Sequence, residues 1–186
     1  MLNFNLSKID KTWTLFLDRD GVINVEKKDA YILNASEFIF LDGVTKALKI
    51  LSEIFGLILI VSNQRGVSKG VMSLEDLHDV HAYMLEELSR QKGHIDKIYF
   101  CIDMNSDSPN RKPNPGMALQ AKKDFPQIDF SKSIMVGNKL SDMQFARNAG
   151  MYAVFIASTN PEIAFPHELI DIRFNSLQEF AGAFRH

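Results

Sequence analysis

The chain has 186 residues, 46% of them hydrophobic, which suits one compact domain over residues 1–186 and excludes disorder as its dominant state. Its formal charge of -2 excludes the basic excess typical of nucleic-acid-binding proteins. The longest apolar run, residues 54–61, is far shorter than the ~20 residues that span a membrane, and the first residues lack the layout of a signal peptide. Because Cys101 is the only cysteine, no internal disulfide can form; we expect a cytoplasmic protein with no membrane or nucleic-acid partner.

Short apolar runs alternate with longer amphipathic segments along the chain, a pattern typical of βαβ units. Five of these runs lack proline and are rich in Ile, Val, Leu, Phe or Tyr, so they predict strands that are buried on both faces of a parallel sheet. They comprise residues 13–17, 57–62, 95–101, 133–136 and 152–156. The pattern therefore predicts an α/β fold, a three-layer sandwich with a central parallel sheet.

The amphipathic segments predict helices with recognisable ends. Residues 43–55 follow Asp42, a candidate N-cap, and residues 74–91 follow Ser73, with Asp76 three residues on as a variant of the capping box. Three further residues are placed to mark helix ends: Pro115 in a first helical turn, Gly150 as a C-terminal cap, and Ser176 as the cap of a last helix ending near residue 184.

Polar residues follow the predicted strands at four places. These are residues 18–24, 62–70, 111–117 and 137–142. In parallel sheets ligands bind beyond the carboxyl ends of the strands, where the loops converge. We therefore expect these four segments to meet in one site.

The segment LFLDRDGVINV places Asp18 at the end of the first strand and Asp20 two residues later, followed by Gly21, which permits a sharp turn. Two carboxylates can then face one pocket, with Asp18 as a nucleophile towards a phosphate monoester and Asp20 as an acid and base. The alternative for D-x-D-G taken alone is an ordinary turn with solvated acids.

Two other segments offer groups that can hold a phosphate. Ser62 follows the run LILIV, so its hydroxyl and nearby N–H groups can bind phosphoryl oxygens, although Ser-Asn-Gln is also typical of a plain loop. In RKPNPGM, Pro113 and Pro115 restrict the backbone beside Lys112, which indicates a rigidly held cation. An exposed Lys-Pro turn is the alternative.

The segment MVGNKLSDM supplies Asn138 and Asp142 after the fourth strand, in positions to begin a helix and reach a metal ion. Magnesium prefers oxygen ligands and commonly keeps waters, so two carboxylates, an amide oxygen and a phosphate oxygen suffice. The alternative is that Asp142 only caps the helix.

Together, LFLDRDGVINV, VSNQRGVSKG, RKPNPGM and VGNKLSDM resemble the four ordered motifs of the haloacid dehalogenase (HAD) superfamily of phosphotransferases. More narrowly, the chain is similar over nearly its whole length to the D-glycero-D-manno-heptose 1,7-bisphosphate 7-phosphatases and the related histidinol-phosphatases. The resemblance implies a HAD-like Rossmannoid fold without a cap domain. It also implies Mg²⁺-dependent hydrolysis of a sugar phosphate monoester through an aspartyl-phosphate intermediate, in nucleotide-activated heptose synthesis.

The resemblance also implies a set of site residues. Asp18 is then the nucleophile and Asp20 the acid/base, while Ser62, Arg111 and Lys112 stabilise the phosphoryl group. The implied metal ligands are Asp18, the main-chain carbonyl of Asp20, and Asn138, with Asp142 as a further candidate. The implied substrate-binding residues are Glu26, Lys27, Lys28, Asp29, Asn63, Gln64, Arg65 and Lys139. As a hypothesis of our own, Arg65 and Lys69 contact a second phosphate of the substrate.

Two features depart from the family pattern. Asn138 stands where aspartate is common, which predicts weaker magnesium binding with activity retained. Many relatives bind zinc in the loop before RKPxPGM, but residues 102–110 contain no Cys or His, so we expect no structural zinc and interpret Cys101 as a buried strand-end residue. His78 and His81 lack a third metal ligand, and we interpret both as part of a solvated helix surface.

Three alternatives remain open at this point. Histidinol phosphate is the second candidate substrate. A catalytically weak phosphate-binding regulatory protein is a second class, motivated by Asn138, and the expected oligomeric state is a monomer or a weak homodimer. The retention of Asp18, Asp20, Ser62 and Lys112 favours the enzyme.

Overall fold

The fold is a six-stranded sheet between two layers of helices, in a computed structural model that describes residues 4–184. All neighbouring strands pair in parallel, in the order β3-β2-β1-β4-β5-β6. The strands are β1 (Thr14–Leu17), β2 (Leu57–Asn63), β3 (Lys97–Cys101), β4 (Ser133–Gly137), β5 (Tyr152–Ile156) and β6 (Ile172–Phe174). The helices are α1 (Val44–Ile54), α2 (Leu74–Arg90), α3 (Gly116–Asp124), α4 (Leu140–Ala149) and α5 (Leu177–Gly182).

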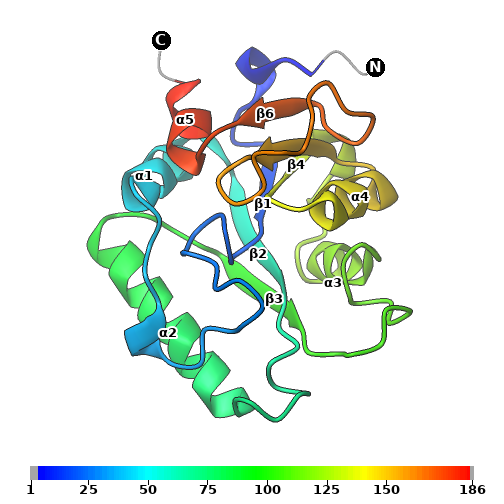
Figure 1. Ribbon diagram of the computed structural model, residues 1–186. Coiled ribbons are helices and arrows are strands. Elements are labelled where there is room, and N and C mark those ends of the chain that lie inside the picture. The colour runs from blue at the N-terminus through cyan, green and yellow to red at the C-terminus, as the bar shows by residue number, and fades with distance from the viewer. Residues whose placement is uncertain (1–3, 185–186) are drawn as a thin grey trace.

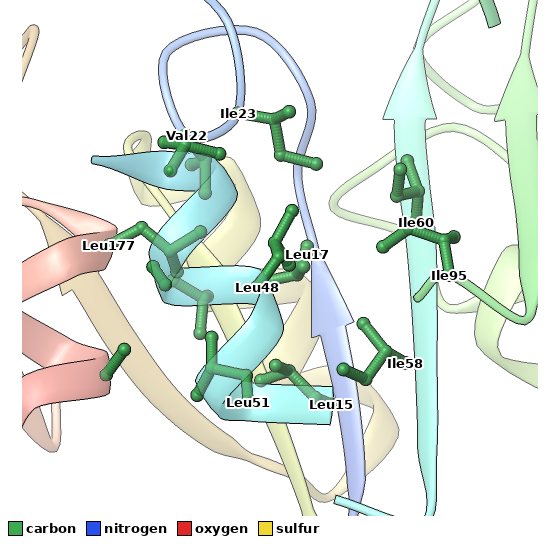
Figure 2. Close-up of a cluster of buried hydrophobic side chains, with 14 of the residues drawn as sticks. Leu15, Leu17, Val22, Ile23, Leu48, Leu51, Ile58, Ile60, Ile95 and Leu177 are labelled. Atoms are coloured by element: carbon green, nitrogen blue, oxygen red, sulfur yellow. The ribbon is translucent and has the colours of Figure 1, made fainter. Parts of the chain in front are cut away.

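The helices cover both faces of the sheet, with α1, α2 and α5 on one side and α3 and α4 on the other (Figure 1). Successive residues of β1 enter the two cores in turn: Leu15 and Leu17 pack with α1, and Phe16 packs with α3 and α4. Figure 2 shows Leu15 and Leu17 beside Leu48 and Leu51 of α1. Burial on both faces explains why the strands appear in the sequence as unbroken apolar runs, and it confirms the predicted three-layer sandwich.

The five predicted strands are present with small shifts of their ends, and the structure adds a sixth, β6, that the apolar pattern did not predict. This edge strand has three residues, all half-buried, and it lacks the long apolar run of the inner strands. A polar contact fixes the chain just before it: the Asp171 carboxylate accepts from the Ala153 backbone N–H at 2.8 Å and from Arg147. Short, half-exposed strands carry little periodic signal.

The predicted helix ends are confirmed except at α3, which begins one residue after Pro115, and at α1. Its N-cap is Gly43 rather than Asp42, with φ of 72°, and a β-carbon there would lie 1.8 Å from Oε1 of Gln178. The positive φ favours glycine at this position, whereas the Gln178 side chain is flexible and could move away. The capping box of Ser73 and Asp76 forms as expected at α2. Pro115, Gly150 and Ser176 occupy the N-cap of α3, the C-cap of α4 and the N-cap of α5.

The chain order in the sheet sets the position of a site. From β1 the chain adds β2 and β3 on one side, and β4 then pairs with the other side of β1. The loops after β1 and β4 therefore part at a switch point, where α/β sheets bind ligands. No inserted domain interrupts residues 4–184, and none of the helices in this range is long and apolar enough to cross a membrane. Residues 1–3 of the segment considered for a signal peptide lie outside the described residues.

Candidate active site

A polar cavity of about 670 Å³ lies at the carboxyl ends of β1, β2 and β4. Asp18, Ser62 and Lys112 line it and are buried, with exposed fractions of 6%, 1% and 3%. Lys28 is exposed and does not line it. The other lining residues that the sequence singled out are Asp20, Glu26, Lys27, Asp29, Asn63, Gln64, Arg65, Lys69, Arg111, Lys139 and Asp142.

Asp18 shares one buried cation with Asp142. Nζ of Lys112 lies 2.8 Å from Oδ1 of Asp18 and 2.7 Å from Oδ1 of Asp142. Burial raises the pKa of Asp18 to about 6, with Asp142 adding to the rise and Lys112 opposing it. Burial alone would lower the pKa of Lys112, but the two carboxylates raise it above its usual value. Lys112 is therefore a fixed positive charge beside Asp18.

The main chain of Lys112 is held by the end of β2. The Lys112 N–H donates to Oδ1 of Asn63 at 3.0 Å, and Nδ2 of Asn63 donates back to the Lys112 carbonyl at 3.1 Å. The Lys112–Pro113 peptide is cis. Asn63, which the resemblance places among the substrate contacts, thus uses its amide to position the loop that carries the cation.

Asp142 acts at the start of α4 as well as in the ion pair. Its Oδ2 accepts from the Lys139 N–H at 3.0 Å, which caps the helix, while Oδ1 binds Lys112. A β-carbon at Gly137 would lie 2.3 Å from Cβ of Asp142, so glycine permits this close packing. Both oxygens of Asp142 are therefore bonded to the protein.

Asp20 lies in a different set of contacts. Nη2 of Arg19 donates to both of its carboxylate oxygens at 2.9 Å, and the side-chain amides of Asn24 and Gln64 each donate at 2.9 Å. Burial would raise the pKa of Asp20, but Arg19 and these hydrogen bonds hold it below its usual value. Gln64 also donates to Oγ of Ser62 at 2.8 Å, which ties the first two motifs together.

Asn138 is fully buried, and its amide has one orientation. Nδ2 donates to Oε2 of Glu26 at 3.0 Å and to Oγ1 of Thr159 at 2.6 Å, while Oδ1 has no hydrogen-bond partner among residues 4–184. Lys139 pairs with the other oxygen of Glu26. Gly21 has φ of 83°, and a β-carbon there would lie 2.1 Å from Nδ2 of Asn138. The sequence did not reveal the contact with Thr159.

These donors fit a hard divalent cation. A buried amide oxygen with no partner is costly unless a ligand binds it, and Oδ1 of Asn138 is such an atom. Within residues 4–184 no three side chains drawn from His, Cys, Asp and Glu are grouped to hold a metal ion. By the motif resemblance, a magnesium ion would draw on Asp18, the main-chain carbonyl of Asp20 and the Asn138 oxygen, which are the hard oxygen donors it prefers.

The comparison with known families agrees with this arrangement. The family described as "Polynucleotide kinase 3 phosphatase" matches residues 14–160, which include all four motifs. The chain belongs to this family of HAD-superfamily phosphatases.

Individual relatives are similar in sequence or structure to most of this chain. A D-glycero-alpha-D-manno-heptose-1,7-bisphosphate 7-phosphatase of Campylobacter jejuni is 38% identical over 148 residues, covering 80% of this chain and 84% of that protein. A D-glycero-beta-D-manno-heptose-1,7-bisphosphate 7-phosphatase of Helicobacter pylori is 35% identical over 161 residues, covering 86% of this chain and 91% of that protein. A crystal structure of a D,D-heptose 1,7-bisphosphate phosphatase from B. bronchiseptica, complexed with magnesium and phosphate, superposes with a TM-score of 0.83 at 26% identity, covering 92% of this chain and 97% of that chain. These likenesses confirm the capless HAD-like fold that the motifs implied.

The phosphatase cavity is also lined by cations that are less buried than Lys112. Arg65, Lys69 and Arg111 line it, and Nζ of Lys69 lies 5.2 Å from the ring centroid of Tyr31. Burial and the nearby Arg65 charge lower the pKa of Arg111. Repulsion between neighbouring cations favours an anion between them.

Two interpretations from the sequence have different outcomes. Cys101 is confirmed as a buried residue at the end of β3, and burial raises its thiol pKa. The interpretation of His81 as a solvated residue is wrong: it is 5% exposed and its Nε2 lies 3.3 Å from Nη1 of Arg19. His78 is exposed as expected. The buried contact arises because Arg19 turns inward, which helix periodicity does not reveal.

Proposed function

We propose that this phosphatase removes the 7-phosphate of D-glycero-D-manno-heptose 1,7-bisphosphate in a magnesium-dependent reaction. The observation that carries the proposal is the buried Asp18–Lys112 ion pair in a cavity that is also lined by the cations Arg65 and Lys69. This layout suits a small substrate with two phosphates, one at each end. The heptose 1,7-bisphosphate 7-phosphatases named among the relatives support the choice of sugar and leave the anomer open.

The proposed reaction has two steps. An oxygen of Asp18 attacks phosphorus, the bond from phosphorus to the sugar oxygen breaks, and Asp20 gives its proton to that oxygen. Water then attacks the aspartyl-phosphate, Asp20 takes a proton from that water, and phosphate leaves with Asp18 restored. Ser62, Lys112 and Arg111 hold the phosphoryl oxygens, and Lys112 offsets their charge throughout.

The resting site favours the ionised form of Asp20, because Arg19 and two amides hold its pKa low. This form suits the second step directly. For the first step a proton must be present on Asp20, and the arrival of a phosphate anion nearby favours protonation because a like charge raises the pKa of a carboxyl group.

Magnesium fits the remaining donors of the site. Asp18, the Asp20 carbonyl and Asn138 would hold it, and when bound it supplies positive charge that offsets the phosphate and the Asp18 carboxylate. Asp142 is the weaker candidate ligand, since its two oxygens bind Lys112 and the start of α4. Glu26, Lys27 and Lys139 line the same cavity and are our candidates for contacts with the sugar.

A sugar phosphate fits this cavity better than a nucleic acid. The family name refers to a nucleic-acid phosphatase, but the chain has a formal charge of -2, and its cations lie inside a cavity of about 670 Å³. Nucleic-acid binding depends on an extended basic surface that contacts several phosphates. We therefore retain the expectation of a small-molecule substrate.

Phosphate release from a panel of substrates tests the proposal. The panel holds both anomers of heptose 1,7-bisphosphate, histidinol phosphate and simple sugar monophosphates, each with magnesium and with EDTA. We expect magnesium-dependent preference for a heptose bisphosphate, with the 1-phosphate retained in the product. Preference for histidinol phosphate, or turnover unaffected by EDTA, would contradict the proposal.

A further inference from the structure

Arg19 is the largest of the fully buried side chains, at 1% exposure, and it lies between Asp20 and helix α2. Nη2 donates to both oxygens of Asp20 at 2.9 Å, and Nε lies 3.3 Å from Oδ1. On its other side, Nη1 lies 3.3 Å from Nε2 of His81. Arg19 thus connects the acid/base residue to a rigid helix.

The contact with His81 defines the state of the imidazole. A guanidinium group only donates hydrogen bonds, so Nε2 of His81 must accept, and the ring is neutral with its proton on Nδ1. Burial and the Arg19 charge lower the pKa of His81 to about 3, in agreement with a neutral ring. The ring also packs against Phe100 of β3 with centroids 5.5 Å apart. His81 is therefore a fixed acceptor.

The planar fork of Arg19 constrains the direction of the Asp20 carboxylate. Arginine binds both oxygens of a carboxylate at once, which fixes the carboxylate plane in a way that a single donor does not. Asn24 and Gln64 add one donor to each oxygen. A catalytic group must be held within a fraction of an ångström of its productive position, so a side chain that controls this direction affects proton transfer.

We propose that Arg19, held in place by His81, is the positioning residue of Asp20. The inference rests on the proposed role of Asp20 as the acid that protonates the leaving oxygen. Arg19 acts through the Asp20 carboxylate that it binds, and the proposal assigns it no contact with the substrate. Without its fork, Asp20 keeps only its two amide donors and can rotate away from the leaving group.

The dependence of kcat/KM on the leaving group tests the proposal, because kcat/KM reports the first chemical step. A sugar alkoxide needs a proton to leave, whereas p-nitrophenolate does not. For D20N we expect a loss of about 10²–10⁴-fold on the sugar phosphate and a much smaller loss on p-nitrophenyl phosphate. R19M should show the same selectivity: we expect kcat/KM to fall about 10–100-fold on the sugar phosphate and less than about 3-fold on p-nitrophenyl phosphate.

Variants of His81 provide a second route if R19M does not fold. H81L removes the acceptor and should reduce turnover of the sugar phosphate selectively, though less than R19M. H81Q offers an amide oxygen to Nη1 and should restore most of it. H78Q is the matched control, because His78 lies on the same helix and is exposed.

The outcomes separate this inference from the proposed function. Equal losses on both substrates in R19M and H81L, or no loss, with D20N still selective, would overturn the positioning role alone. A D20N enzyme without selectivity would overturn the acid role of Asp20 and this inference with it. If the wild type cleaves p-nitrophenyl phosphate but no heptose bisphosphate, the substrate proposal fails, and the best sugar monophosphate of the panel replaces it in the comparison.

Discussion

Asp18 and Asp20 are two residues apart, yet they lie in opposite electrostatic environments. Burial raises the pKa of Asp18 to about 6, and its cation Lys112 is shared with a second carboxylate. Asp20 has its own guanidinium and two amide donors, which hold its pKa below the usual value. The comparison shows that a strand end can place two identical side chains in different electrostatic environments through the partners that surround them.

The largest expected effect is the loss of turnover in D18N. The substitution preserves shape but removes the nucleophilic charge, so we expect kcat to fall by about 10⁴-fold or more on every phosphate ester, including p-nitrophenyl phosphate. D79N is the matched control, because Asp79 is exposed on α2. Steady-state phosphate release measures both. Substantial activity in D18N would remove Asp18 from its proposed role.

Removing the shared cation should cost both stability and activity. K112M leaves Asp18 and Asp142 buried without their common partner, so the free energy of unfolding should fall by about 3–5 kcal/mol. In K112M/D142N only one carboxylate remains unpaired, and the loss should be smaller than in K112M. Urea unfolding of the metal-free proteins tests this. A loss in K112M/D142N that is equal to or larger than the loss in K112M would show that the three side chains do not act as one unit.

These contacts also show what the sequence could and could not reveal. Unbroken apolar runs gave the inner strands, and the short D-x-D-G and RKPNPGM segments pointed to Asp18, Asp20 and Lys112. Sequence spacing cannot reveal that Lys112 pairs with Asp142, because this contact depends on how the loop that carries Lys112 packs against the start of α4.

The environment of Asp20 was harder still to predict. Arg19 is charged and follows a strand end, which in most sequences places a side chain in solvent. Its burial depends on an acceptor 62 residues away on α2, and helix periodicity alone placed His81 in solvent. Contacts of this range are set by packing between layers, so they appear only in the folded structure.

Replacing Asn138 by the aspartate that is common at its position should have a smaller effect, on stability and on magnesium binding. Nδ2 of Asn138 donates to Glu26 at 3.0 Å, so N138D places two carboxylates together. We expect the melting temperature of metal-free N138D to lie about 3–6 °C below that of the wild type, which corresponds to a loss of about 1–2 kcal/mol in the free energy of unfolding. Magnesium should then raise the melting temperature of N138D by more than it raises that of the wild type. N138D/E26Q should recover the metal-free stability, as measured by thermal denaturation with and without magnesium. Equal melting temperatures for N138D and the wild type would contradict the Glu26 contact.

The smallest expected effect concerns pH and His81. Its pKa is lowered to about 3 in the folded chain from an ordinary 6.5, so the unfolded chain binds more protons between these values. The stability that neutral His81 contributes is therefore complete above pH 6.5 and is lost as the pH falls. From about pH 7 to about pH 5 the wild type should lose about 1–2 kcal/mol more than H81Q in urea unfolding, since Asp18 titrates in both proteins. If the wild type and H81Q lose the same free energy of unfolding between these pH values, His81 is not buried as a neutral ring.

Mass spectrometry of the phosphorylated enzyme tests the central claim most directly. D20N is mixed with p-nitrophenyl phosphate, whose leaving group needs no acid, and the reaction is then quenched in acid. The aspartyl-phosphate should accumulate before the quench, because D20N lacks the base that its hydrolysis needs. We predict one phosphoryl group on Asp18 in the peptide that contains it, and none in D18N. A phosphoryl group on another residue, or an unmodified peptide throughout turnover, would contradict the different roles assigned to the two carboxylates.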